Sequence, residues 1–422
     1  MTGPRAEIPG RSTIPAPGRR TKVGVAVARA SALLAALLCA CGGGGGGAGG
    51  PPPVPAEAFP PGIRDGPLVS RLAPTELTIA FRTTSAVPAD VAYGPTPSYG
   101  AVASTVAAPE HEARLPGLLP GTTYHYRLRL PTGFAGPDHA TRTPPADADV
   151  AAFRVVAVGD TGSGDAGARS VRDLVLSLAP DLVLDAGDVA YPAGTAEQVR
   201  GGLLYPYAEV LARVPLLPVW GNHDVGTLSG APLADALVLP TNDEDGSERF
   251  YRQRWGALEV FCLDSNDDVG AGSPQRAWFA RSLAASTARW RFVVFHHPAY
   301  SSSRHGSTAA IDASLVPLFD AAGVDLVING HDHDYERTHP LRAGVPSDVG
   351  GGPDYLDPAG TIYVVTGGGG QELYPAGTSP FTARSESVRH AVAIDVTPST
   401  LTVRAVRVGG TPIETFTITK SP

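Results

Sequence analysis

Lysine is nearly absent from the 422-residue sequence: Lys22 and Lys420 are the only two among 33 basic residues. Acidic residues outnumber basic ones, and the formal net charge is -8. A protein that binds nucleic acid through its phosphates needs a basic face that displaces counterions. We therefore expect no nucleic acid binding. Because alanine, glycine and proline are heavily used, the shortage of lysine indicates a coding bias rather than a function.

Cysteine is also rare, with three residues in the chain: Cys39, Cys41 and Cys262. If Cys39 is removed with a leader and Cys41 is modified, Cys262 is the one thiol left and cannot form an internal disulfide. Cys262 lies in the apolar stretch Leu258-Glu259-Val260-Phe261-Cys262-Leu263, which is typical of a strand. We therefore expect Cys262 to be a small buried core residue rather than a nucleophile.

Near the N-terminus the chain lacks an apolar run long enough to span a bilayer. The stretch Ala30 to Leu38 is short and follows Arg29, but it has the layout of an export signal covering residues 1–41. Its end, Leu38-Cys39-Ala40-Cys41, resembles the lipobox of bacterial lipoproteins, which implies a lipid anchor at Cys41. We expect an exported protein of the bacterial cell envelope, periplasmic or surface-exposed, whose only contact with the membrane is this anchor. A plain secretory signal and a secreted protein are the alternative.

Composition and periodicity divide the rest of the chain into three parts. Residues 42–62 are rich in glycine and then proline, which is typical of a tether. Residues 63–144 contain alternating stretches such as Glu76 to Arg82 and Thr123 to Leu130, which predict an all-β sandwich of antiparallel strands. The stretch Leu118 to Tyr124 resembles the corner of fibronectin type III domains, where a tyrosine hydroxyl bonds to the backbone near the turn.

Residues 150–420 have longer apolar runs separated by helix-like stretches, including Ala168 to Ala179 and Gln275 to Leu283. Alternating strands and helices predict βαβ units and a mainly parallel sheet. Later strands, Thr361 to Val365, Ala391 to Val396 and Leu401 to Val406, predict a second sheet. The expected fold class is an N-terminal all-β sandwich followed by an α/β domain of two packed sheets flanked by helices. Four glycines, Gly367 to Gly370, either let the backbone approach a site or form a mobile loop.

Polar residues follow five apolar runs at the point where each run ends. These endings are Gly159-Asp160, Asp185-Ala186-Gly187-Asp188, Gly221-Asn222-His223-Asp224, His296-His297 and Asn329-Gly330-His331-Asp332-His333. One Gly-Asp after a strand is most often a turn. Ligands, however, gather at the carboxyl ends of parallel strands, and five such endings in order predict a metal site. Tyr191 lies three residues after Asp188 and adds a hard oxygen donor suited to a trivalent metal.

These motifs resemble the five signatures of the calcineurin-like metallophosphoesterases. Tyr191 and the tail Asp334-Tyr335-Glu336-Arg337 narrow the resemblance to the purple acid phosphatases, over roughly residues 63 to 420. The resemblance implies hydrolysis of phosphate monoesters, with a small-molecule phosphate ester as substrate. It also implies an Fe(3+) site and a divalent site for Fe, Zn or Mn. The implied ligands are Asp160, Asp188, Tyr191 and His333 for Fe(3+), and Asp188, Asn222, His296 and His331 for the divalent metal.

The resemblance further implies that the two metals hold a phosphoryl group and generate a hydroxide between them. His223 and His305 match the histidines that bind phosphate and protonate the leaving alkoxide in the family. Arg304 is expected to disfavour a proton on His305 through like charge. Gly306 stands where the plant enzymes carry a further histidine, which leaves substrate preference and acidity optimum open. For His297 and His339, packing or solvent exposure is expected.

Two alternatives stay open at this point. A phosphodiesterase of the same superfamily would use the same metal cluster, because the metals do not decide how many ester groups the phosphorus carries. A non-catalytic surface adhesion module is the other alternative, against which the intact ligand set argues, since adhesion does not require every ligand. The sequence does not name the physiological substrate or the oligomeric state.

Overall fold

The structure, a computed structural model, describes residues 59–147, 151–242, 246–350 and 352–422. All of them belong to one compact unit, Gly49–Pro422. The expected export signal, the lipobox and nearly all of the tether lie outside the described residues. Within the described ranges, no helix is both long enough and apolar enough to cross a membrane.

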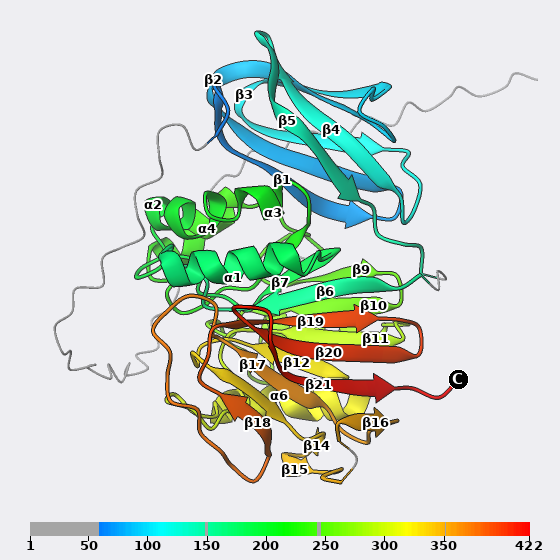
Figure 1. Cartoon of the computed structure of the whole chain (residues 1–422), viewed down its shortest axis with the longest axis vertical. Coiled ribbons are helices and arrows are strands. Elements are labelled where there is room, and N and C mark those ends of the chain that lie inside the picture. Colours follow the sequence, from blue (N-terminus) through cyan, green and yellow to red (C-terminus); the bar gives the residue numbers. More distant parts are fainter. Residues whose placement is uncertain (1–58, 148–150, 243–245, 351) are drawn as a thin grey trace, which may run out of the picture. The chain divides into compact units, whose positions relative to one another are not determined.

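The N-terminal region forms one antiparallel network of five strands, blue to cyan in Figure 1. The alternation of buried and exposed residues in the sequence explains why these segments are strands with one covered face. The strands predicted within residues 76–82 and 123–130 are confirmed. The network consists of β1 (Ile63–Ala73), β2 (Glu76–Gly94), β3 (Ala101–Pro116), β4 (Thr123–Leu130) and β5 (Gly133–Arg142).

Strands β2 and β3 each change partners along their length. Up to Arg82, β2 pairs with β1 and with the end of β3. From Ala89 onward it pairs with the start of β3 and with β4. Register shifts separate the two halves of the β2 to β3 ladder around Val87. At the following corner, the buried Tyr124 hydroxyl accepts a hydrogen bond of 2.9 Å from the backbone N–H of Leu119. This tyrosine-to-backbone hydrogen bond confirms the one predicted from the sequence.

Two seven-stranded sheets form the rest of the described chain. The first has the order β16 (Asp354–Leu356), β21 (Pro412–Thr419), β20 (Thr400–Arg407), β19 (His390–Val396), β6 (Phe153–Val158), β7 (Leu182–Asp185) and β8 (Leu216–Pro218). The second has the order β18 (Thr382–Glu386), β13 (Tyr335–Thr338), β17 (Ile362–Thr366), β12 (Leu326–Asn329), β11 (Trp290–Val294), β10 (Leu258–Cys262) and β9 (Tyr251–Trp255). The short strands β14 (Leu341–Arg342) and β15 (Val345–Pro346) pair with each other.

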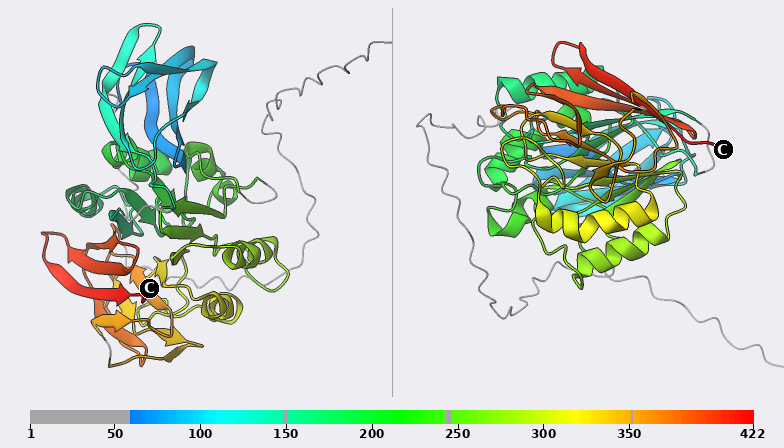
Figure 2. Two further views of the ribbon diagram at one scale, coloured as in Figure 1. Left: turned by 90° about the vertical axis from the view of Figure 1, so that its right-hand side faces the viewer. Right: turned by 90° about the horizontal axis from the view of Figure 1, so that it is seen from below.

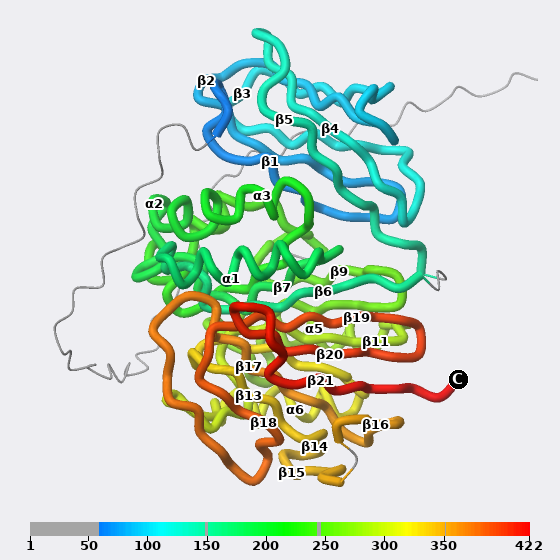
Figure 3. The backbone as a smooth tube through the Cα atoms, viewed as in Figure 1, coloured from blue at the N-terminus to red at the C-terminus, as the bar shows by residue number. Residues whose placement is uncertain are grey.

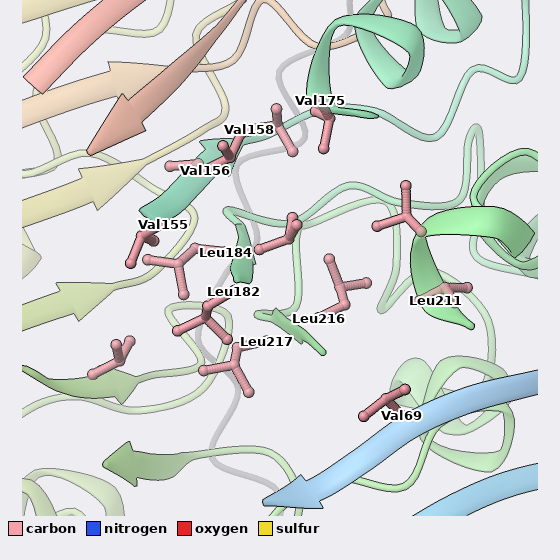
Figure 4. Close-up of a cluster of buried hydrophobic side chains, with 14 of the residues drawn as sticks. Val69, Val155, Val156, Val158, Val175, Leu182, Leu184, Leu211, Leu216 and Leu217 are labelled. Carbon is pink, nitrogen blue, oxygen red and sulfur yellow. The ribbon is translucent and has the colours of Figure 1, made fainter. Parts of the chain in front are cut away.

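The facing sides of the two large sheets share one apolar core. Val155, Leu184 and Leu217 represent the first sheet, and Figure 4 shows them among their neighbours in β6, β7 and β8. Val260 and Ile328 contribute from the second sheet. Burying such side chains is the main favourable contribution to folding, about 1.5–3 kcal/mol for each. The core therefore fixes the positions at which the strands end.

Cys262 lies at the end of β10 and is fully buried. Burial raises the pKa of its thiol to about 12. A thiol with so high a pKa is a poor nucleophile at neutral pH, because the thiolate is the reactive form. The prediction that Cys262 is a core residue is confirmed.

Helices cover the outer faces of the two sheets. Figure 2 shows α5 and α6, in yellow-green and yellow, side by side at one face in its right-hand view. Phe279 and Phe319 from these helices pack on Phe261 and Val293 of the second sheet. The helices predicted within residues 168–179 and 275–283 are confirmed as α1 and α5. The helices are α1 (Ala166–Ser177), α2 (Ala196–Val199), η1 (Arg200–Leu204), α3 (Ala208–Leu211), η2 (Leu228–Gly230), α4 (Ala231–Ala236), α5 (Pro274–Ala284) and α6 (Ala309–Ala322).

The prediction that the late strands form a second sheet of their own is wrong. Strand β17 pairs in parallel with β12 in one sheet, whereas β19 pairs antiparallel with β6 and extends the other. Figure 3 shows the tube of β19, β20 and β21 continuing the layer that contains β6. Apolar alternation shows which face of a strand is buried, but it does not specify the neighbouring strand. The late strands are therefore divided between two mixed sheets, each with a parallel centre.

Candidate metal centre

Five strand ends bring the seven predicted ligands to one place. Three of these strands, β6, β7 and β8, are in the first sheet, and β11 and β12 are in the second. The loops after the strands carry the polar side chains, because each strand is buried up to its last residue. In order along the chain, the ligands are Asp160 after β6, Asp188 and Tyr191 after β7, Asn222 after β8, His296 after β11, and His331 and His333 after β12.

Three of these residues have a backbone conformation that non-glycine residues rarely adopt. The φ angles of Asp160, Asp188 and His331 are 60°, 57° and 72°. Such left-handed conformations cost about 1–3 kcal/mol each and persist mainly at functional sites. Gly187, with a φ of 96°, forms a sharp turn after β7 and directly before Asp188.

Glycines beside the ligands leave no room for a side chain. A Cβ atom on Gly330 would lie 2.5 Å from Asp160 Oδ2, and one on Gly367 would lie 2.8 Å from the same atom. A Cβ on Gly221 would overlap the carboxylate of Asp188. Of the two alternatives for the four-glycine stretch, close approach of its backbone to the site is therefore confirmed.

One group of side chains gathers around Asn222. The Nε2 atom of His296 lies 3.0 Å from Asn222 Oδ1 and 3.4 Å from Asp188 Oδ2. The Nδ1 atom of His331 lies 3.0 Å from the same Asn222 oxygen. Ligand atoms of Asp160, Asp188 and His296 all lie within 4.8 Å of one another, and these three residues are buried. This spacing suits donors that point at a common cation.

A second group gathers around Asp160. The Tyr191 hydroxyl donates a 2.9 Å hydrogen bond to Asp160 Oδ1. The Nε2 atom of His333 lies 3.4 Å from that carboxylate oxygen and 3.5 Å from the Tyr191 hydroxyl. Carboxylate, phenol and imidazole donors thus meet around Asp160, and the amide and the two other imidazoles meet around Asn222.

Backbone carbonyls fix the orientation of three imidazole rings. His296 Nδ1 donates to the carbonyl of Ala186 at 2.8 Å, His333 Nδ1 to Glu372 at 2.7 Å, and His223 Nδ1 to Pro192 at 2.7 Å. A carbonyl can only accept, so in each ring Nδ1 carries the proton and Nε2 is left for the site. Metal-binding histidines in proteins are oriented in this way.

The electrostatic balance of the site also fits a bound cation. Burial lowers the pKa of His296, but Asp188 and Asp160 outweigh it and raise that pKa to about 10. Burial, together with the same carboxylates, holds the pKa of Tyr191 well above its ordinary value. Buried charges need to be paired or to coordinate a metal. A cation among these groups would replace the imidazolium as the partner of the carboxylates and would favour the phenolate.

Two buried carboxylates that were not assigned a role from the sequence support the ligand loops. Asp224 Oδ2 accepts hydrogen bonds from the backbone N–H groups of Asp188 at 2.8 Å and Gly221 at 2.9 Å. Asp185 accepts from Gly187 N–H at 3.0 Å, and burial raises the pKa of Asp185 to about 8. Asp185 and Asp224 both belong to the sequence motifs, but nothing in the sequence distinguished a carboxylate that holds a ligand loop from one that binds a metal.

His223 and His305 lie at the more exposed side of the ligands. His223 is 37% exposed, and its Nε2 lies 4.0 Å from Asp188 Oδ2. The ring of His305 lies over that of His331, with centroids 4.2 Å apart. Burial lowers the pKa of His305, and Arg304 adds to this effect. The predicted direction for Arg304 is confirmed, although burial is the larger cause.

His297, the residue after a predicted ligand, is packed against the site rather than within it. Its Nδ1 forms a 2.8 Å hydrogen bond with Ser265, and burial lowers the pKa of His297 to about 3. His339 is partly buried. The expectation that both are packed or exposed residues is confirmed.

Tyr374 is a site residue that the sequence did not indicate. It lies in the loop between β17 and β18, and its ring stacks on His333 with centroids 4.1 Å apart. The same ring meets that of His305 edge-on, with centroids 5.5 Å apart. No motif or periodicity includes this tyrosine, so only the fold of its loop places it here.

Comparison with known proteins finds a family match over part of this chain. Residues 153–335 match the calcineurin-like phosphoesterase family. Purple acid phosphatase 15 of Arabidopsis thaliana is 27% identical over 62% of this chain. The match spans 53% of that plant protein. An uncharacterized protein of Mycobacterium tuberculosis is 28% identical over 71% of this chain and 68% of its own length.

A solved structure shares the fold. The purple acid phosphatase PPD1 from yellow lupin (Lupinus luteus) superposes with a TM-score of 0.74 and 20% sequence identity. The superposition covers 85% of this chain and 75% of the lupin chain. The α/β fold with two large sheets is therefore shared with this lupin protein.

Proposed function

We propose that this chain, which carries a calcineurin-like phosphoesterase domain at residues 153–335 and is homologous to purple acid phosphatases, hydrolyses phosphate monoesters at a dinuclear metal centre. The observation that carries the proposal is the set of close contacts among the predicted ligands. Ligand atoms of Asp160, Asp188 and His296 lie within 4.8 Å of one another, and the other four ligands contact members of this group or each other. A small-molecule phosphate ester is the proposed substrate.

The two groups of donors would hold two different metals. Asp160, Tyr191 and His333 offer hard oxygen donors and one imidazole, which suits Fe(3+). Asn222, His296 and His331 offer an amide and two imidazoles, which suit divalent Fe, Zn or Mn. The carboxylate of Asp188 lies close to both Asp160 and His296, one from each group, and would serve both metals. When bound, such a metal pair supplies Lewis acidity toward the phosphoryl oxygens and lowers the pKa of water.

His223 and His305 would act on the phosphate itself. His223 Nδ1 is held by a carbonyl, so Nε2 is the atom available to the substrate. The backbone N–H of His305 donates to Asp332 Oδ1 at 2.8 Å, which fixes the start of its side chain above His331. An imidazolium at either position would stabilise charge on the transferred group and donate a proton to the leaving alkoxide.

The test compares His223→Ala and His305→Ala on alkyl and aryl phosphates. Loss of a proton donor should lower turnover by about a hundredfold to ten-thousandfold for alkyl phosphates, whose leaving group needs the proton. Aryl phosphates should be affected least, and both metals should stay bound. His125→Ala, in the N-terminal β-region, is the matched control. Loss of a metal, or equal slowing of both substrate types, would remove the proton-donor role.

The alternative activity, phosphodiester hydrolysis, is decided by a direct comparison. Aryl phosphate monoesters and diesters with the same leaving group should differ clearly in kcat/KM, in favour of the monoester. A preference for the diester would assign the domain to the phosphodiesterases of the same superfamily. Absence of hydrolysis with both metals bound would favour an adhesion module.

For the N-terminal region we propose a fibronectin type III-like sandwich. The change of partners along β2 and β3, and the hydrogen bond at Tyr124, support this assignment. We further propose export with a lipid anchor at Cys41. Cys41→Ser should release the protein from membranes or leave it unprocessed, whereas Cys39→Ser should do neither. Equal membrane retention and normal cleavage of Cys41→Ser would favour a plain secretory signal.

A further inference from the structure

The loop of residues 301–306, which carries His305, is held rigidly by two carboxylates below it. Asp332 accepts hydrogen bonds from the backbone N–H groups of His305 at 2.8 Å and Gly306 at 3.2 Å. Glu336 accepts from both the backbone N–H and the hydroxyl of Ser302, at 2.6 and 2.7 Å. The backbone of this loop therefore has little freedom to lose when the loop binds a ligand, which favours affinity.

Arg304 lies on this loop and presents its charge toward the site. Its guanidinium carbon lies 4.9 Å from the centroid of the Tyr374 ring, in a cation–π contact. The side chain is exposed, and no Asp or Glu in the described part of the chain lies within 4 Å of its guanidinium nitrogens. Arginine guanidinium groups bind phosphate oxygens in a two-pronged geometry. An arginine that is positioned by a ring and not by a carboxylate keeps its N–H groups available for such an anion.

The ring of Tyr374 lies between the Arg304 guanidinium and the predicted metal ligand His333. One face of its ring stacks on His333, and its backbone N–H donates to the carbonyl of His333 at 3.0 Å. His305, next to Arg304 in the chain, contacts the same ring. The guanidinium is thus one aromatic ring away from a predicted metal ligand, beside the proposed proton donor. If His305 protonates the leaving group as proposed, Arg304 lies on the leaving-group side of the phosphoryl group.

We propose that Arg304 determines specificity by binding a second phosphoryl group on the leaving-group side of the substrate. The substrate class is then phosphate monoesters that carry another phosphoryl group several ångströms from the scissile one. The chain has a net charge of -8, which disfavours such anionic substrates at long range and makes a local cation more important. This inference rests on the proposed function, because it assumes that the scissile phosphate binds at the candidate metal centre.

The first test compares hexanediol bisphosphate with hexanediol monophosphate as substrates of the metal-loaded protein. Arg304→Gln should lower kcat/KM for the bisphosphate about tenfold, since it removes one charge-assisted contact at a partly exposed position. Because the charge of Arg304 also acts on His305, the readout is the ratio of the kcat/KM values for the bisphosphate and the monophosphate, which should fall about tenfold. Arg304→Lys should recover part of the loss, because lysine restores the positive charge but not the paired N–H groups of the guanidinium. Arg114→Gln, an exposed arginine of β3, is the control and should change neither value.

The second test measures binding without turnover, so that it stands apart from the proposed activity. Hexane bisphosphonate and hexyl phosphonate are titrated into wild type and Arg304→Gln by calorimetry. About tenfold weaker binding of the bisphosphonate alone supports the inference, even if wild type hydrolyses no monophosphate and the proposed function fails. Equal weakening of both probes would make Arg304 a general phosphate contact and overturn the inference. An unchanged dissociation constant for the bisphosphonate would also overturn it.

Discussion

Gly330→Ala should damage the metal centre without disturbing the fold around it. A Cβ on this glycine would lie 2.5 Å from Asp160 Oδ2, 3.0 Å from the carbonyl oxygen of Ala186 and 3.2 Å from His296 Nδ1. The backbone of Gly330 is outside the left-handed region, so alanine adds no strain of its own. The added methyl group therefore acts on the Asp160 carboxylate and on the hydrogen bond that orients His296.

The size of the effect follows from these contacts. Ordinary contacts of a Cβ begin at 3.4 Å, so the Asp160 carboxylate must move by about 1 Å. Overpacking of this kind costs about 1–3 kcal/mol of stability. A displacement of about 1 Å costs around a hundredfold in turnover, and disturbed orientation of a ligand costs about tenfold to a hundredfold in metal affinity.

Metal content per chain after dialysis, urea unfolding and kcat/KM together measure these effects. Gly330→Ala should lose metal and activity but unfold cooperatively at a moderately lower urea concentration. Gly350→Ala is the matched control, because a Cβ there meets nothing within 4 Å and its φ is also outside the left-handed region. If Gly330→Ala keeps both metals and nearly full activity, the close packing of glycine against Asp160 does not position the ligands.

Three further predictions address single ligands and the fold. Tyr191→Phe should abolish the visible charge-transfer band expected of the iron-loaded protein, because the Tyr191 hydroxyl lies 2.9 Å from Oδ1 of Asp160, another predicted ligand. A band unchanged by the substitution would make Tyr191 a structural residue. Asp188→Ala should lose both metals, whereas Asn222→Ala should lose mainly the divalent one. Metal analysis after dialysis measures this, and two metals retained in Asp188→Ala would refute the assignment of Asp188 as a shared ligand. Burial lowers the pKa of His390 from the ordinary 6.5 to about 4, so between these pH values the unfolded chain binds a proton that the native chain does not, and stability falls as pH falls. The loss of unfolding free energy due to His390 amounts to about 2 kcal/mol between pH 7 and pH 5. In urea unfolding, His390→Gln should lose less stability than wild type over this range, by that amount. An equal loss in both proteins would contradict the prediction.

The position of the candidate ligands was predictable from the sequence because strand ends are easy to recognise. Asp160 is separated from its apolar run by one residue and Asp188 by three, and strands that run in the same direction end at the same edge. The helix α1 was equally visible, since Val171, Leu174 and Val175 recur at helical spacing and are buried.

Contacts between distant loops were not predictable in the same way. Tyr374 reaches His333 only because its loop folds back over the site, and no local pattern encodes that path. Asp224 is a carboxylate within a motif, yet its role depends on which N–H groups of a neighbouring loop point at it. The neighbouring strands of β17 and β19 were likewise not predictable, because two strands with the same alternation of apolar and polar residues can join different sheets.

The division of the ligands between two sheets has a consequence for the order of assembly. The first sheet supplies Asp160, Asp188 and Asn222, and the second supplies His296 and His333, so neither sheet alone contains a complete site. A partly folded chain with only one sheet formed has no place to hold the metals tightly. Metal uptake would then follow the packing of the two sheets against each other, and each bound ion would link the two layers. Because ligands that bind only the native state stabilise it by mass action, the midpoint of thermal unfolding should rise with metal concentration.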